Sequence, residues 1–267
     1  MDINKRFEMV EQTVSMLVGK KVNSVILAGE GGLGKTHTVM ATLANSGVAD
    51  EVHGEAIAFS NLPDMLCKTW DKSWRAANRA WEKQRKFVTI KGVSTSKGLY
   101  MSLYEHNGKI IVFDDCDDVL DDKKSNSKSI DLLKNALDTY DTRTLNWNAD
   151  MRGKDAPPKV FEFTGQVIFI TNKNLNDIPQ PLRTRSLVID LSMTPQEKID
   201  RMRHIVTQKE FMPKYSTEMK QTAVNWLDHN KADIKDLSMR VLIMAIKLFA
   251  EAKGKESQLI KYTLLNN

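Results

Sequence analysis

One short stretch combines the residue types that can bind a chain of phosphates. Residues 29–36 read Gly-Glu-Gly-Gly-Leu-Gly-Lys-Thr and fit the pattern G-x-x-x-x-G-K-[ST]. Glycines carry no Cβ and accept positive φ, so several backbone N–H groups can point at one anion. Lys35 can neutralise the β- and γ-phosphate oxygens, and the Thr36 hydroxyl can ligate magnesium. The other positions of the expected nucleotide cradle are Gly29, Glu30, Gly31, Gly32, Leu33, Gly34 and His37.

An apolar run that ends in two acids supplies the expected second half of this site. Residues 109–115 read Lys-Ile-Ile-Val-Phe-Asp-Asp. Ligands of open α/β sheets bind beyond the carboxyl ends of the strands, so we expect Asp114 beside the magnesium that Thr36 holds. Asp115 is then the candidate that orients or deprotonates the attacking water. An acidic turn is the alternative interpretation, because further acids follow at Asp117, Asp118, Asp121 and Asp122.

The elements that must position these residues follow an α/β pattern. Runs of β-branched residues alternate with helical patterns through about the first 190 residues, which predicts a parallel sheet covered by helices. We expect each strand to be apolar on both faces, as buried parallel strands are. A helix is expected at the N-terminus, and another should follow the glycine-rich loop and stop near Gly47. The strands are expected at residues 22–28, 86–91, 110–113, 167–171 and 187–191.

The pattern changes to consecutive helices from Thr194 onward. Residues 194–197, Thr-Pro-Gln-Glu, form a capping box with proline at the first helical position. We therefore predict a three-layer αβα domain over residues 1–192 and a small all-helical lid domain over residues 193–267.

Composition places the chain among soluble globular proteins. It has 267 residues, of which 41% are apolar and 27% charged, with a net charge of +5 that weakly indicates a polyanionic partner. The two cysteines, Cys67 and Cys116, have no C-x-x-C spacing. They argue against a disulfide framework or a zinc site and favour a reducing compartment, the cytoplasm. Neither a secretory signal nor a membrane-spanning segment is expected, because no apolar run is long enough.

These motifs together resemble those of the AAA+ P-loop ATPases over about residues 20–250. In its compact size, the chain also resembles the stand-alone AAA ATPases of bacteriophages. Residues 167–172, Val-Ile-Phe-Ile-Thr-Asn, resemble the sensor 1 strand. That resemblance implies that Asn172 contacts the γ-phosphate or the water. The sequence departs from the family at Asp115, where a longer glutamate is more usual.

Two further motifs of this resemblance carry arginines. Residues 178–185 resemble the arginine-finger segment, in which one subunit completes its neighbour's site; Arg185 matches that position best and Arg183 second. Residues 236–240 resemble sensor 2, which implies that Arg240 reaches the nucleotide from the helical lid.

The resemblance implies an activity and its partners. It implies magnesium-dependent ATP hydrolysis by a homo-oligomeric ring, a hexamer, acting on DNA or nucleoprotein complexes in phage DNA metabolism, in the host cytoplasm. A protein-remodelling motor is one alternative, although residues 94–104 offer only Leu99, Tyr100 and Tyr104 for a pore loop. A nucleotide-controlled assembly switch with little turnover is another.

Two segments are candidates for binding a polymer such as DNA. Residues 68–91 hold eight basic and two acidic residues. On a helix, the stripe that contains Lys72, Arg75 and Arg79 can contact phosphates or a neighbouring subunit, or it can be a solvated face over a buried apolar stripe. Residues 143–163 resemble the pre-sensor 1 β-hairpin, with Arg152 and Lys154 near its tip; a plain surface hairpin is the alternative.

Overall fold

The structure, a computed structural model, describes residues 2–50, 86–92, 95–121, 127–148, 157–252 and 258–265. Its centre is a six-stranded sheet in the order β2-β3-β4-β7-β1-β8, and every neighbouring pair is parallel. The predicted α/β class with a parallel sheet is therefore confirmed. The strands are β1 (Ser24–Ala28), β2 (Ala49–Asp50), β3 (Lys86–Lys91), β4 (Ile110–Asp114), β7 (Gln166–Ile170) and β8 (Leu187–Asp190).

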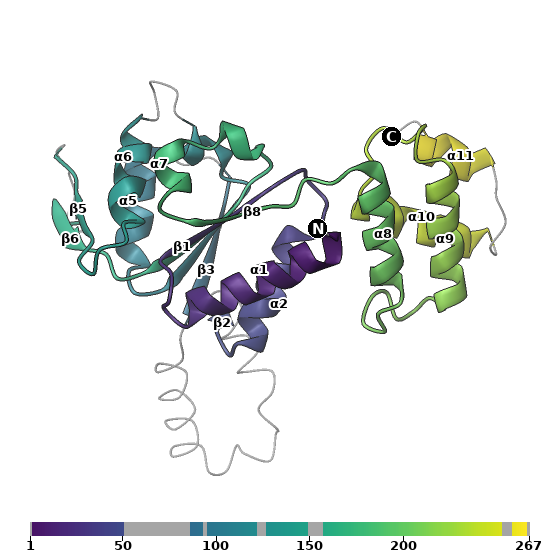
Figure 1. The fold of residues 1–267 in the computed structure, drawn as a ribbon, viewed down its shortest axis with the longest axis horizontal. Helices are drawn as coiled ribbons and strands as arrows, with labels where there is room; N and C mark the ends of the chain where they lie inside the picture. Colours follow the sequence, from purple (N-terminus) through teal and green to yellow (C-terminus); the bar gives the residue numbers. More distant parts are fainter. Residues whose placement is uncertain are drawn as a thin grey trace, which may run out of the picture.

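Successive strand residues point to opposite faces of the sheet, and each face is covered by its own helices. Val25 and Leu27 join one apolar cluster, whereas Ile26 and Ala28 join the other. Figure 1 shows the resulting three layers, with α1 and α2 on one side of the sheet and α5, α6 and α7 on the other. These helices are α1 (Ile3–Val18), α2 (Lys35–Asn45), α5 (Ser96–Glu105), α6 (Ser127–Ala136) and α7 (Gln180–Arg183).

Two strands differ from the prediction that all would be buried on both faces. In β8, Leu187 is 39% exposed, because this strand is an edge of the sheet. In β3, the residues from Thr89 onward are only partly buried or exposed, because the neighbouring strand β2 has two residues and pairs only with the start of β3. The β2 strand itself was not predicted, since two residues carry no readable periodicity.

The segment before β7 forms an antiparallel pair of strands. Here β5 (Thr144–Asn146) pairs with β6 (Val160–Glu162). Aromatic rings fix this pair to α5, since Tyr100 lies 5.6 Å from Trp147 and 5.3 Å from Phe161 between ring centroids. The guanidinium of Arg143 anchors its base by donating to the carbonyl oxygens of Ala136 and Gly165.

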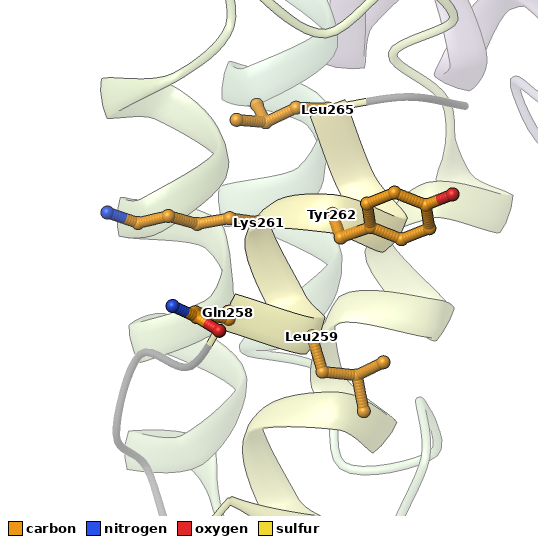
Figure 2. Close-up of a pocket in the computed structure, with 5 residues that line it drawn as sticks. All are labelled: Gln258, Leu259, Lys261, Tyr262 and Leu265. Carbon is orange, nitrogen blue, oxygen red and sulfur yellow. The ribbon is translucent and has the colours of Figure 1, made fainter.

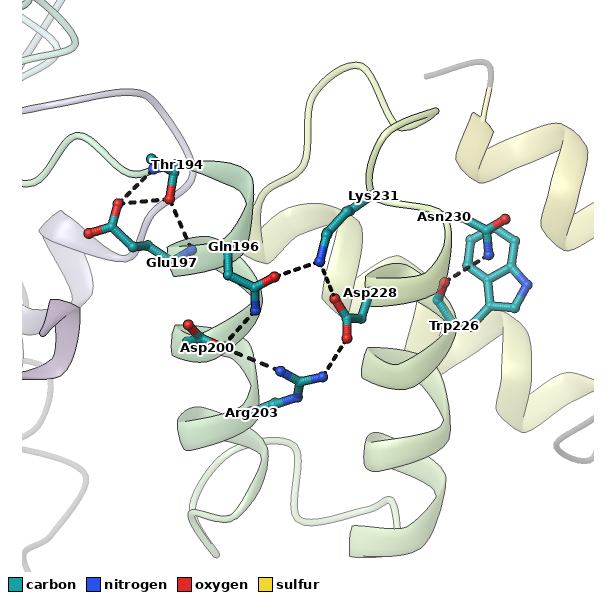
Figure 3. Close-up of polar contacts among 9 residues, drawn as sticks. All are labelled: Thr194, Gln196, Glu197, Asp200, Arg203, Trp226, Asp228, Asn230 and Lys231. Atoms are coloured by element: carbon teal, nitrogen blue, oxygen red, sulfur yellow. Dashed lines mark hydrogen bonds and ion pairs between the residues drawn. The ribbon is translucent and has the colours of Figure 1, made fainter.

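The remaining helices pack around a separate apolar core after the sheet ends, to the right in Figure 1. The predicted capping box is present, because Thr194 accepts from the Glu197 backbone N–H and Glu197 accepts from that of Thr194. Figure 3 shows polar contacts between the first two helices of this group, α8 and α9, where Arg203 bridges Asp200 and Asp228. The helices are α8 (Pro195–Val206), α9 (Thr217–His229), α10 (Met239–Glu251) and α11 (Gln258–Leu265).

The connecting turns include two short 3-10 helices, η2 (Asp117–Leu120) and η3 (Leu175–Asp177). Within the described ranges, every helix is too short or too polar to cross a lipid bilayer.

Candidate nucleotide-binding site

The glycine-rich loop connects the carboxyl end of β1 to the start of α2. Gly29, which follows β1, has φ +140°. A Cβ there would lie 2.9 Å from the carbonyl carbon of Leu191, which follows β8, so a residue with a side chain does not fit at this position. Gly34 has φ +91° at the N-cap of α2, and a Cβ there would meet nothing within 4 Å. The loop therefore leaves open space at the positive end of α2, where an anion is favoured.

Lys35 is the cation of this loop, and only 5% of the residue is exposed. Its Nζ donates to the carbonyl oxygens of Gly29 at 2.6 Å and Glu30 at 2.7 Å and to Asn172 Oδ1 at 3.1 Å. Burial lowers the pKa of Lys35, while the nearby carboxylates, Asp115 first, oppose the shift. The loop thus holds a partly desolvated ammonium, which an anionic ligand would stabilise.

Asp114 and Thr36 lie together, as the motifs predict. The Thr36 hydroxyl donates to Asp114 Oδ1 at 2.9 Å, and Asp114 is 2% exposed. Lys91, one of the eight basic residues of 68–91, was not expected at this site, yet its Nζ lies 2.9 Å from Asp114 Oδ2. The hydrogen bond to Asp114 raises the pKa of Lys91.

Asp115 and Asn172 form the third part of the site. Asp115 has φ +57° and donates its backbone N–H to Ile170 O, an arrangement that exposes its side chain beyond β4. The Asn172 amide bridges two groups, because its Nδ2 donates to Asp115 Oδ1 at 2.9 Å while its Oδ1 accepts from Lys35. The strand order explains this contact, since β7 lies between β1 and β4. Asn172, just after β7, therefore lies between the glycine-rich loop after β1 and the turn with Asp115 after β4.

One cavity of about 520 Å³ is lined by Lys35, Thr36, Asp114, Asp115 and Asn172. Its floor is the glycine-rich loop from Gly31 onward, together with His37, and the acids lie along one side. Leu33 lines it and also packs into the core. The opposite wall comes from the helical domain, and apart from Arg240 these residues were not predicted: Arg201, Ile205, Gln208, Glu210, Phe211, Met212, Met239 and Ile243. Apart from Met239, which lies within the sensor 2 segment at residues 236–240, no local motif marks them, because only tertiary packing brings them to the loop.

The helical domain contacts the glycine-rich loop directly. The backbone N–H of Met239 donates to Gly32 O at 2.9 Å, and a Cβ on Gly32 would lie 3.1 Å from Ser238 Cβ. Lys198 on α8 forms an ion pair with the Glu30 carboxylate. Through these contacts the start of α10 is seated on the loop, which brings Arg240 to the cavity rim.

The N-terminal helix α1 also contacts both domains. The Arg201 guanidinium carbon lies 3.9 Å from the centroid of the Phe7 ring, and its Nη1 donates to Asn4 Oδ1 at 3.0 Å. Burial lowers the pKa of Arg201. Arg6 donates to the Ser192 carbonyl and pairs with Glu197, so α1 fixes the start of α8.

The two candidate finger arginines lie away from this cavity and do not line it. Arg185 donates from Nη1 to Pro181 O at 3.0 Å, and its Nε lies 3.9 Å from Asp138 Oδ2. The Arg185 carbonyl oxygen accepts a hydrogen bond from the hydroxyl of Ser24, which is the first residue of β1. The glycine-rich loop follows Ala28, the last residue of that strand. Arg185 is therefore at the amino edge of the sheet and Lys35 at the carboxyl edge. Arg183 is the last residue of α7, two positions earlier.

Several other predicted residues lie outside the site or outside the described residues. Leu99 and Tyr100, considered for a pore loop, are fully buried, and Tyr104 stacks edge-on against Phe161. The candidate nucleic-acid residues Lys72, Arg75, Arg79, Arg152 and Lys154 fall outside the described ranges.

A second hollow lies on α11, far along the chain from the loop. Figure 2 shows Leu259 and Tyr262 on one side of the helix and Lys261 on the other. Leu259 and Tyr262 are 61% and 73% exposed. This surface has neither a glycine-rich loop nor carboxylates among its lining residues, so it does not suit a metal–nucleotide complex.

The residues of the first cavity fit a nucleotide with magnesium. The Thr36 hydroxyl and the Asp114 carboxylate are the hard oxygen ligands that Mg²⁺ prefers. Lys35 and the N-terminus of α2 suit the phosphate chain. The apolar side chains of the opposite wall, such as Phe211 and Ile243, offer a surface for a flat base.

Comparison with known proteins gives one relative and a set of solved structures. The chain is 25% identical over 273 residues to an uncharacterized 36.7 kDa protein from the nrdC-mobD intergenic region of Enterobacteria phage T4, covering 95% of this chain and 72% of that protein. It is similar to the Thermotoga maritima RuvB Holliday junction branch migration motor, with 12% identity, 96% of this chain and 72% of that chain covered, and a TM-score of 0.37. Two RuvB variants give TM-scores of 0.43 and 0.41 at 12% and 11% identity, with the same coverage. No protein-family model matches the chain.

The fold and the site together define a P-loop α/β domain followed by a helical domain. In the order of its motifs the chain resembles the AAA+ P-loop ATPases, and its relative in phage T4 agrees with the expected likeness to a phage protein.

Proposed function

We propose that this chain hydrolyses ATP with magnesium and works as an AAA+ ring motor on DNA or nucleoprotein complexes. One observation carries the hydrolytic part: Lys35, the Thr36–Asp114 pair and the Asp115–Asn172 pair converge on one cavity. Phosphoryl transfer needs a loop that binds the phosphates, a cation, metal ligands and a group that orients the attacking water. This cavity has a candidate for each of them.

Each residue has a distinct task in this proposal. Thr36 and Asp114 hold the magnesium, which supplies charge stabilisation on the phosphate oxygens when bound. Lys35 neutralises the phosphate chain, and the Met239 contact keeps Arg240 at the rim. Asp115 accepts the proton of the attacking water, while the Asn172 amide holds that carboxylate in place.

The proposed polymer substrate rests on charge and on the antiparallel β5–β6 pair. Eight basic residues lie within positions 68–91, and basic clusters of this density are suited to phosphate backbones. The β5–β6 pair is fixed to α5 by aromatic contacts, and Arg152 and Lys154 lie between its two strands in the sequence. The relative in phage T4 supports the phage origin in this proposal.

Hydrolysis measured with single-stranded DNA, duplex DNA, candidate proteins or no polymer tests this proposal. We expect magnesium-dependent turnover that DNA stimulates and that salt suppresses steeply. The Lys35→Ala variant controls for contaminating ATPases. Stimulation by a protein alone would favour the remodelling motor, and nucleotide-dependent assembly with negligible turnover would favour the switch; either result contradicts the proposal.

A further inference from the structure

Lys91 occupies a position beside the candidate metal site that the hydrolytic roles leave unexplained. It is the last residue of β3 and stands in register with Asp114 at the end of β4. Its Nζ lies 2.9 Å from Asp114 Oδ2. The Lys91 side chain is 63% exposed, whereas the Asp114 side chain is 4% exposed.

Both oxygens of the Asp114 carboxylate therefore have a partner. Oδ1 accepts from the Thr36 hydroxyl, and Oδ2 pairs with Lys91. A buried carboxylate is costly to ionise unless a cation and hydrogen bonds balance it. Lys91 supplies that cation, and it also restricts how the carboxylate can rotate toward Thr36.

We propose that Lys91 is a positioning residue that stands in for the divalent cation at Asp114 until a metal–nucleotide complex arrives. This inference rests on the proposed function, because it takes Asp114 as a metal ligand. A divalent ion that binds Oδ2 of Asp114 must displace the Lys91 ammonium, and one that binds Oδ1 beside Thr36 lies close to that ammonium. Free Mg²⁺ would also bring two positive charges to a site that already holds Lys35 and Lys91.

The same two lysines act differently on a metal bound to a triphosphate. That complex carries a net negative charge, so the cationic pair attracts it and repels the free ion. Lys91 thereby makes metal binding depend on the nucleotide. Its position at a strand end permits release, because the chain turns away at Gly92, where φ is +88°, and the side chain already borders solvent.

The test measures binding of Mn²⁺ without nucleotide, through the paramagnetic signal of the free ion. Lys91→Met removes the charge and keeps the stem, and Lys91→Gln is a second variant that keeps a hydrogen-bond donor. We expect both to bind free Mn²⁺ about tenfold or more tightly than the wild type, given the charge removed at contact distance. Lys91→Arg and Lys97→Met, an exposed lysine on α5, should match the wild type.

Thermal melting gives a second readout that a purely structural role would not produce. In EDTA, Lys91→Met should melt below the wild type, and Mg²⁺ alone should recover much of the difference, while the wild type responds little to Mg²⁺ alone. Unchanged Mn²⁺ affinity in both neutral variants would overturn the role of Lys91.

Titration of the wild type with Mn²⁺ and ATP separates this inference from the proposed function. Failure of the wild type to bind Mn–ATP removes the nucleotide site itself. Normal Mn–ATP binding together with no gain of free Mn²⁺ affinity in the variants removes only the stand-in role.

Discussion

At the scale of single residues, the site depends on short polar contacts between side chains that are far apart in the sequence. Asn172 contacts Lys35 and Asp115, and Thr36 contacts Asp114. The contacts join the start of α2, where Lys35 and Thr36 lie, and residues at or just after the carboxyl ends of β4 and β7. Asp115 is exposed, so a change of its charge should alter chemistry with little effect on folding.

The Asp115→Asn variant tests the assignment of the base. Asparagine tolerates the left-handed backbone that Asp115 adopts at φ +57°, so the fold should persist. Loss of the proton acceptor should lower kcat by about 10² to 10⁴ while leaving ATP affinity nearly unchanged. Steady-state hydrolysis and equilibrium nucleotide binding measure the two quantities.

Asp141→Asn is a matched control, because Asp141 is exposed and does not line the cavity. If Asp115→Asn keeps wild-type turnover, the base is another group.

At the scale of elements, the seating of α10 on the glycine-rich loop links the two domains. Gly32→Ala adds a Cβ that would lie 3.1 Å from Ser238 Cβ at a backbone φ of +74°. We expect a loss of about 1–3 kcal/mol in unfolding free energy from strain and crowding. Weaker ATP binding should follow, because the crowding acts on the contact that closes the cavity.

Gly47→Ala separates strain from crowding, since Gly47 has φ +72° and a Cβ there would meet nothing within 4 Å. Denaturant unfolding of both variants gives the comparison. Equal losses would show that the Ser238 contact has no effect on stability.

The capping box of α8 predicts a pH dependence. A hydrogen bond from the Thr194 backbone N–H is the first cause that lowers the pKa of Glu197, and the Thr194 hydroxyl and Arg6 add to it. Because the folded pKa lies below the unfolded value of about 4.3, the stabilisation is complete above that pH and is lost as the pH falls through the folded value.

Glu197→Gln should therefore lower Tm near neutral pH and lose that difference in acid. Melting curves of the variant and the wild type between pH 7 and about pH 3 follow the effect across this window. Glu8→Gln, at an exposed position on α1, controls for the loss of one negative charge. A Tm difference that stays constant into acid would contradict the linkage.

At the scale of the whole molecule, the positions of Lys35 and Arg185 at opposite edges of the sheet favour a site completed by a second copy. Neither Arg185 nor Arg183 lines its own cavity. A finger that acts on a neighbour explains that separation, since heterologous contacts that close make rings.

Mixing two inactive variants tests this arrangement. Lys35→Ala should abolish ATP binding, and Arg185→Ala should bind ATP with little turnover. In mixed assemblies an Arg185→Ala subunit keeps its own Lys35 and can receive an intact finger from a Lys35→Ala neighbour. Random mixing should restore about a quarter of the wild-type sites, if a finger acts across a heterologous interface.

Hydrolysis of the mixture measures the restored fraction, with each variant alone as the baseline. Arg183→Ala in place of Arg185→Ala identifies which arginine is the finger. No recovery with either arginine variant would contradict a shared site.

The sequence by itself determined the local features of this protein. Residues 29–36 predict the loop conformation, because glycine accepts the positive φ found at Gly29 and Gly34 and the close approach of Leu191 at Gly29. The strand ends at Asp114 and Asn172 and the capping box at Thr194 follow equally from short patterns. These features depend on residues that are near one another in the chain, and their sterics and hydrogen bonds can be recognised there.

Only the tertiary structure decided which of these features meet. The insertion of β7 between β1 and β4 brings Asn172 to Lys35, and the parallel register of β3 with β4 places Lys91 beside Asp114. The wall with Arg201 and Phe211 comes from the helical domain, which follows the sheet in the chain. Strand order and domain packing depend on long-range burial of apolar surface, which no short stretch of sequence encodes.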